Sequence, residues 1–260
     1  SGYGLTLGIH TRIDETIDFI TKRAHVGNIY VNRNIVGAVV GVQPFGGEGK
    51  SGTGPKAGGP LYLKRLQRNA PAGAQHQRQA APALDALTVW AKMHGHDKVM
   101  HLAQEYTRTT LLGSTTVLPG PTGERNTLSF AARGTILCAA ATTGVLMNQL
   151  AAVLATGNQA LVLAQSPALI PGDLPAALKD RIQVVTSLES VKHDFQIAMI
   201  EPVLDSQLKP LLAAREGALV GTIETTEEGV IPLWRLVAER ALCVNTTAAG
   251  GNASLMMLSV

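Results

Sequence analysis

Runs of strand length alternate with helical patterns through the second half of this 260-residue chain. Gly134–Cys138 and Gln159–Leu163 are apolar runs of strand length, and the helical run Val145–Ala155 lies between them. A helix of that length can serve as the crossover between two parallel strands. The alternation continues with strands expected at Ile182–Val185, Gln196–Ile200 and Ala218–Ile223 and a helix at Leu204–Ala214. The pattern predicts an α/β fold with a doubly wound, Rossmann-like sheet.

Shorter patterns predict elements elsewhere in the chain. Apolar residues recur at helical spacing from Ile13 to Ala24, and Thr11 is the expected N-cap of this helix. A second helical stripe runs from Leu84 to Ala91, with Trp90 beside it. Further strands are expected at Asn28–Asn32, Thr115–Leu118 and Asn126–Ala131.

The composition indicates a globular chain of one or two domains. Hydrophobic residues make up 45% and charged residues 16%, and the net charge of +3 comes with no basic stripe that would suggest nucleic acid. Cys138 and Cys243 are too few for a disulfide framework and lie in apolar runs. We therefore expect buried thiols in a reducing, cytoplasmic compartment. Polar residues interrupt the most apolar stretch, 134–164, so no membrane span is predicted.

A polar stretch rich in alanine, proline and glycine divides the chain. Residues 67–82 have no apolar period and are predicted to be an inter-domain linker. The predicted domains are therefore residues 1–66 and 83–260. The sequence begins at Ser1 without a methionine, and we expect it to be a fragment of a longer protein.

The segment Gly27–Gly59 reads GNIYVNRNIVGAVVGVQPFGGEGKSGTGPKAGG. Glycine at this density lets the backbone adopt positive φ and approach a ligand or another chain closely. Pro44 fixes its own φ, and Phe45 is a lone aromatic in a polar, flexible run. Composition alone is equally compatible with a long surface loop.

This segment resembles the C-terminal end of aldehyde dehydrogenases, where a "VN" strand leads through a variable loop to "PFGG…SG.G…G". The opening SGYGLTLGIHT is similar to the family's "YGL…G..T" segment. The string NRNIVGAVVGVQPFGGEGKSGTGPKAGGPLYLKRL most resembles the glutamate-semialdehyde (1-pyrroline-5-carboxylate) dehydrogenase branch, and within it the bifunctional proline utilization A enzymes. The resemblance covers Ser1 to about Leu66.

The resemblance implies substrate-binding residues in this chain but no catalytic residue. In that branch the loop before "PFGG" binds the substrate's α-carboxylate through backbone N–H groups, which implies Gly37 and Ala38 as donors. The motif's phenylalanine, here Phe45, lines the aldehyde pocket. The alternative is that these residues only shape the loop. The family's catalytic cysteine and glutamate lie upstream, and neither Cys138 nor Cys243 has the surrounding motif of the nucleophile.

Two details of the motif bear on this assignment. Gly46 and Gly47 are expected to serve the backbone geometry of the loop and not to contact the substrate. Lys50 stands where a small or apolar residue is commoner in the family, which leaves the local contacts there open.

The second domain resembles the family's coenzyme-binding segment in a decayed form. The segment Arg133-Gly-Thr-Ile-Leu is similar to the family's "RGPVL" strand. The segment from Leu150 to Asn158 is similar to the family's "A.AL..GN" motif. The "WNFP" turn is replaced by Ala141–Gly144, and the ribose-binding lysine falls at Leu163. The missing residues imply that 83–260 is a non-catalytic, aldehyde-dehydrogenase-like domain.

The resemblance also implies the cofactors and partners of the whole enzyme. NAD would accept the hydride when glutamate semialdehyde is oxidised to glutamate, and FAD would belong to an upstream proline dehydrogenase domain outside this chain. No residue here is assigned to a cofactor. The expected partners are glutamate semialdehyde, the rest of the same polypeptide and further copies of it in a homo-oligomer.

The terminal run Thr246–Ser254 resembles a flap that docks over the dehydrogenase site and closes an internal tunnel. One alternative is an ordinary edge strand. Another is that the whole second domain is an oligomerisation module without influence on catalysis.

Three histidines, His94, His96 and His101, lie close together in the sequence. Their spacing matches no standard metal site, and no acidic or thiol ligand completes one. We therefore expect an exposed helix end and no metal.

Overall fold

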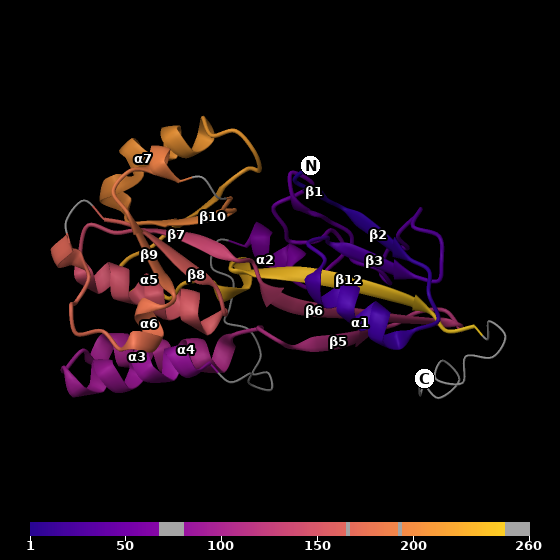
Figure 1. The fold of residues 1–260 in the computed structure, drawn as a ribbon, viewed down its shortest axis with the longest axis horizontal. Helices are drawn as coiled ribbons and strands as arrows, with labels where there is room; N and C mark the ends of the chain where they lie inside the picture. Colours follow the sequence, from indigo (N-terminus) through magenta and orange to yellow (C-terminus); the bar gives the residue numbers. More distant parts are fainter. Residues whose placement is uncertain (68–80, 165–166, 192–193, 248–260) are drawn as a thin grey trace. The chain divides into compact units, whose positions relative to one another are not determined.

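The structure is a computed structural model that describes residues 1–67, 81–164, 167–191 and 194–247, and it divides into two compact units (Figure 1). Unit 1 comprises Ser1–Pro71, Thr115–Phe130 and Ala238–Val260. Unit 2 comprises Ala72–Ser114 and Ala131–Val237. Each unit contains a five-stranded sheet of its own.

The sheet of unit 2 is parallel, in the order β11-β10-β7-β8-β9. Its strands are β7 (Thr135–Ala139), β8 (Gln159–Leu163), β9 (Ile182–Val185), β10 (Ile197–Ile200) and β11 (Gly221–Glu224). The helices are α3 (Pro82–Met93), α4 (Asp97–Thr109), α5 (Thr143–Ala155), α6 (Ala176–Lys179) and α7 (Asp205–Ala213). The chain adds strands on one side of β7 and then on the other. This topology confirms the predicted α/β, doubly wound class.

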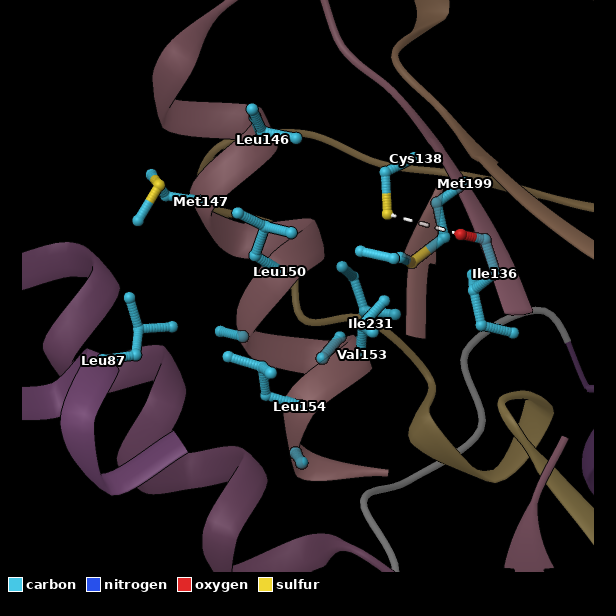
Figure 2. Close-up of a cluster of buried hydrophobic side chains, with 14 of the residues drawn as sticks. Leu87, Ile136, Cys138, Leu146, Met147, Leu150, Val153, Leu154, Met199 and Ile231 are labelled. Carbon is cyan, nitrogen blue, oxygen red and sulfur yellow. Dashed lines mark hydrogen bonds between the residues drawn. The ribbon is translucent and has the colours of Figure 1, made fainter. Parts of the chain in front are cut away.

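The period of two along β7 divides the core of unit 2 between the two faces of the sheet. Ile136 and Cys138 pack with α3, α4 and α5 in one cluster, whereas Leu137 and Ala139 pack with α7 in the other. Every residue of α5 from Val145 to Ala155 is buried. A helix that is apolar all round is one enclosed by protein, and Figure 2 shows side chains of the first cluster gathered around α5.

The sheet of unit 1 is mixed, in the order β2-β3-β12-β6-β5. Its strands are β2 (Thr6–Ile9), β3 (Asn28–Val31), β12 (Val237–Asn245), β6 (Glu124–Ala132) and β5 (Thr115–Leu118). The first three run parallel, and β5 and β6 form an antiparallel hairpin. The remaining elements of unit 1 are β1 (Tyr3–Gly4), α1 (Asp14–Arg23), β4 (Glu48–Gly49) and α2 (Tyr62–Leu66). Helix α1 packs Ile17 and Ile20 on the apolar side chains of β2 and β3.

The predicted boundary at residue 83 does not coincide with the division into compact units. Strands β5, β6 and β12 follow that residue in sequence but join β2 and β3 in one sheet. All four residues of β3 are buried, and β12 supplies its second neighbour, with Cys243 opposite Tyr30. The similar runs Tyr30-Val-Asn and Cys243-Val-Asn therefore lie side by side in register. Most of the predicted linker and of the predicted flap, 68–80 and 248–254, lies outside the described residues.

Local details of the structure differ from the predictions. Helix α1 begins at Asp14 after Ile13 as N-cap, because the backbone of Thr11 is bonded to the Asn32 side chain and the Thr11 hydroxyl accepts from Ile13. Helix α4 follows α3 after a short turn and was not predicted as a separate helix. Strand β11 begins at Gly221, three residues later than predicted.

Candidate functional site

The loop between β3 and β4 contains the three predicted substrate-binding residues. It leaves β3 at Asn32, a non-glycine residue in the left-handed region with φ 54. The Asn32 side chain accepts from the Thr11 N–H (3.1 Å) and donates to the Thr11 carbonyl (2.9 Å). Asn245, at the end of β12, donates to the Asn32 carbonyl (3.1 Å). The start of the loop is therefore fixed from both neighbouring strands.

The loop borders an open hollow of about 530 Å³ in unit 1. Its lining comprises Ile35, Gly37, Ala38, Val40, Gly41, Gln43, Phe45, Ala57 and Gly58. The structure thus brings Gly37, Ala38 and Phe45, the three predicted residues, to one hollow. Most of the lining is apolar, as in pockets for small molecules.

Backbone donors are available at the rim of this hollow. Within the described residues, the N–H groups of Gly37 and Ala38 have no hydrogen-bond acceptor. Gly37 and Gly41 have φ of 82 and 81, and a Cβ at either position would meet nothing within 4 Å. Glycine is favoured there by backbone conformation and not by space. Two uncommitted N–H groups in succession are suited to a carboxylate.

Phe45, which also lines the hollow, is held by backbone hydrogen bonds. Its N–H donates to the Ala57 carbonyl (3.0 Å), and the Ala57 N–H donates back (2.9 Å). The residue is 36% exposed, so Phe45 is accessible from the hollow that it lines. A Cβ on Gly47 would lie 2.5 Å from the Ser51 Cβ and 2.9 Å from the Gly4 carbonyl oxygen, so close packing favours glycine there.

A buried polar cluster forms hydrogen bonds to the backbone next to Phe45. Lys56 is 2% exposed, and its ammonium donates to Asn28 Oδ1 (3.1 Å) and to the Gly46 carbonyl. Its backbone N–H donates to Oε2 of Glu239 on β12 (2.7 Å). Burial lowers the pKa of Lys56 to about 8, although Glu239 and Glu48 oppose the shift. Sequence patterns gave no indication of this cluster, because its members come from three distant segments.

The two cysteines lie in different surroundings. Cys138 is enclosed by the apolar cluster of unit 2, where its Sγ lies 3.9 Å from the Ile136 carbonyl (Figure 2), and burial raises the pKa of its thiol. Cys243 is also buried, but Nη1 of Arg33 (3.0 Å) and Nε2 of Gln43 (3.3 Å) contact its Sγ. Cys243 is therefore buried as expected, but its sulfur has polar neighbours. Burial raises the pKa of Cys243 and Arg33 opposes the rise, so neither thiol has the exposed setting of a nucleophile.

Unit 2 does not fit a dinucleotide at the start of α5, where a coenzyme domain would hold phosphate. Oε2 of Glu201 accepts from the N–H groups of Ala141 (2.7 Å) and Thr142 (3.2 Å) and so takes the place of an anion. The Glu227 carboxylate lies within 2.9 Å of a Cβ built on Gly144. A pyrophosphate there would meet two carboxylates. Together with Leu163 in the lysine position, this disfavours NAD binding in unit 2.

The histidine cluster has local partners. His94 and His96 both stack on Trp90 with ring centroids 4.9 Å apart, and Nε2 of His94 lies 2.8 Å from Asp173. His101 contacts the Asp97 carbonyl (2.7 Å). In the described ranges, no three His, Cys, Asp or Glu side chains are grouped to hold a metal ion. No helix among the same residues has the length and apolar character needed to cross a membrane.

Comparison with known proteins finds family similarity in the N-terminal residues of this chain. A profile of the aldehyde dehydrogenase family matches residues 1–69. The 1-pyrroline-5-carboxylate dehydrogenase of Bacillus cereus (strain B4264) is 52% identical over 61 residues, which cover 24% of this chain and 12% of that protein. Residues 1–69 therefore match the sequence of the aldehyde dehydrogenase family.

Similarity extends over nearly the whole chain to the C-terminal regions of proteins named bifunctional protein PutA. The protein from Escherichia coli (strain K12) is 47% identical over 281 residues, which cover 99% of this chain and 21% of that protein. The protein from Rhizobium meliloti is 43% identical over 274 residues, with 99% and 22% covered. The chain therefore spans about a fifth of the length of these curated relatives.

A solved structure shows the same fold. Proline utilization A from Corynebacterium freiburgense superposes with a TM-score of 0.60 at 22% sequence identity, over 94% of this chain and 23% of that one. At this identity the likeness shows the fold alone, and it includes both of the units described above.

Proposed function

We propose that this chain is the C-terminal part of a bifunctional proline-catabolic enzyme and forms the substrate-anchoring side of its glutamate-semialdehyde dehydrogenase site. The observation that carries the proposal is the hollow at which Gly37, Ala38 and Phe45 meet. The similarity of the whole chain to PutA proteins, and of residues 1–69 to aldehyde dehydrogenases, supports it.

The residues of this chain would bind and orient the substrate. The N–H groups of Gly37 and Ala38 donate to the α-carboxylate, and Phe45 packs on the aliphatic chain that carries the aldehyde. Because the donors belong to the backbone, they bind the carboxylate through hydrogen bonds without a buried cation. The aldehyde carbon is thereby held toward a nucleophile and a general base from the preceding part of the polypeptide.

The cofactors would lie outside this chain. NAD, bound by the preceding part of the dehydrogenase, would supply the hydride acceptor, in agreement with the carboxylates at the start of α5 in unit 2. FAD would serve a proline dehydrogenase domain further upstream. Residues 83–260 would contribute no catalytic group, and the run Thr246–Ser254 would serve as a flap over the dehydrogenase site.

The competing prediction, an interaction module without influence on catalysis, is not favoured. Side chains from β6 and β12 bond directly to the loop and to the Phe45 segment. Glu124 contacts Arg33 and Gln43, and Glu239 contacts Lys56. The C-terminal strands thus reach the residues that shape the hollow.

A proline at position 38 tests the anchoring role, because it removes one donor. In the full-length polypeptide, Ala38→Pro is expected to raise KM for glutamate semialdehyde about tenfold, equivalent to about 1.4 kcal/mol. The kcat should change little, since the carboxylate is bound equally in the ground and transition states. Ala38→Gly, which keeps the N–H, is the matched control. The result that would refute the proposal is an equal loss for an aliphatic aldehyde that lacks the α-carboxylate.

A further inference from the structure

The loop that presents the two donors has little packing of its own. Val36 and Val40 are 76% and 93% exposed, and the space around Gly37 and Gly41 is open. A segment with so few buried contacts belongs to the least stable parts of a protein. Its conformation therefore depends on how its two ends are held.

One carboxylate contacts both ends of this loop. Glu124, the first residue of β6, accepts from Nη1 of Arg33 through Oε1 (2.7 Å) and from Nε2 of Gln43 through Oε2 (3.2 Å). Arg33 stands at the start of the loop and Gln43 at its end. The Arg33 and Glu124 side chains are 16% and 22% exposed, and Gln43 is buried. These charge-assisted hydrogen bonds are therefore largely shielded from water.

Gln43 transmits this hold into the loop. The side-chain oxygen of Gln43 accepts from the backbone N–H of Val39 (3.0 Å). The backbone N–H of Gln43 donates to the Val39 carbonyl (2.9 Å). Its amide nitrogen is directed away from the loop, toward acceptors on Glu124, Asn126 and Cys243. The orientation of the amide thus links Glu124 to the residue that follows Ala38.

The role requires a carboxylate and not merely an acceptor. Both oxygens of a carboxylate accept, so Glu124 can hold a donor at each end of the loop. A glutamine in its place has one acceptor oxygen, and its NH2 group would face either Arg33 or Gln43, which are both donors. The positive charge of Arg33 offsets the negative charge of Glu124. The pair therefore adds little electrostatic repulsion toward an anionic substrate.

We propose that Glu124 is a positioning residue of the dehydrogenase, which holds the loop of Gly37 and Ala38 in the conformation that receives the substrate carboxylate. The proposal rests on the proposed function, because it requires this loop to bind that carboxylate. Glu124 itself does not touch the substrate; it acts through Arg33 and Gln43. A residue of the C-terminal region thereby sets the substrate preference of the preceding domain.

Kinetics of Glu124→Gln in the full-length polypeptide test this role. We expect KM for glutamate semialdehyde to rise about tenfold, equivalent to about 1.4 kcal/mol, with kcat nearly unchanged. The kinetics with an aldehyde that lacks the α-carboxylate should stay as in the parent enzyme. Gln43→Met keeps the volume, removes the amide and should give the same pattern. The double variant should be no worse than either single variant, because both act through one link.

Glu105→Gln is the matched control, since Glu105 forms a surface pair with Arg108 on α4 in unit 2. A purely structural role would lower kcat/KM for both aldehydes together, and that result would overturn the proposal. An unchanged KM in Glu124→Gln and Gln43→Met, with the expected loss in Ala38→Pro, would overturn it while leaving the proposed function standing. If Ala38→Pro also has no effect, the proposed function fails as well. Should Glu124→Gln not fold, Gln43→Met decides.

Discussion

The two five-stranded sheets of this chain differ in what they bury. The sheet of unit 2 is covered on both faces by apolar side chains, and its central strands β7 and β10 read as hydrophobic runs, as is usual for parallel sheets. The sheet of unit 1 carries carboxylates on β6 and β12, and Glu124 and Glu239 hold the segments around the hollow. Unit 2 therefore obtains stability from its sheet, whereas unit 1 uses part of its sheet to position a loop.

Under the proposed function, residues 83–260 contribute no catalytic group, and most of these residues lie in unit 2. A coenzyme domain needs an open anion site at the start of its first helix, and Glu201 fills that position in unit 2. Strands β6 and β12, however, belong mostly to unit 1, and their carboxylates contact the segments around the hollow. Polar groups at a site cost stability that an apolar core elsewhere can offset.

The largest expected effect is the removal of an apolar side chain from unit 2. Leu150 of α5 is 1% exposed within the cluster of Figure 2, and Leu150→Ala should lower the free energy of unfolding by about 2–5 kcal/mol. Both tryptophans, Trp90 and Trp234, lie in unit 2, so urea denaturation followed by tryptophan fluorescence reports this unit. In the full-length polypeptide, any further tryptophans would first have to be replaced, so that the fluorescence signal reports unit 2 alone.

The control for this variant is Leu211→Ala on α7, where the leucine is 49% exposed. Leu211→Ala should lower the free energy of unfolding by well under half as much as Leu150→Ala. The reason is that this substitution removes less buried apolar surface. The ratio of kcat/KM between aldehydes with and without an α-carboxylate should not change in Leu150→Ala. A changed ratio would show that unit 2 also positions the loop, and the contrast between the sheets would fail.

The second effect concerns the buried lysine of unit 1 and its dependence on pH. The pKa of Lys56 is lowered from 10.5 to about 8 by burial, so between these values the unfolded chain binds more protons than the folded one. The free energy of unfolding therefore rises with pH across this window, by about 3 kcal/mol for the full shift. The cost of burying the ammonium is present below pH 8 and disappears as pH approaches 10.5.

Denaturation of the parent protein and of Lys56→Met, followed by circular dichroism from pH 7 to pH 10.5, measures this term as a difference. The difference in unfolding free energy should rise with pH in favour of the parent, because methionine does not titrate. Lys22→Met on the exposed face of α1, where the lysine pairs with Asp18, is the matched control for removal of a lysine. A difference that stays constant with pH would mean that Lys56 keeps its ordinary pKa.

How much the sequence predicts also differs between the units. The strands and helices of unit 2 follow from local apolar runs, and β7, α5 and β8 were predicted nearly to the residue. The pairing of β12 with β3 was not predicted, because it joins segments at opposite ends of the chain. Glu124 and Glu239 were missed for a related reason, since a carboxylate in an alternating strand is normally expected to face solvent. Gly37, Ala38 and Phe45 came from family resemblance, and no periodicity distinguishes them from other loop residues.

The smallest effects, at the two cysteines, compare the units most directly. Cys138→Ser would place a hydroxyl among apolar side chains and should cost about 1–3 kcal/mol. Cys243→Ser should cost less than about 1 kcal/mol, because the hydroxyl can accept from Arg33 and Gln43 as the sulfur does.

The matched alanine variants sharpen the test. At position 138 alanine should be tolerated better than serine, whereas at position 243 alanine should be worse than serine, because two buried donors would lose an acceptor. Denaturation of the four variants gives the sign at each site, and the same sign at both would mean that the two sheets do not differ in polarity as their contacts indicate.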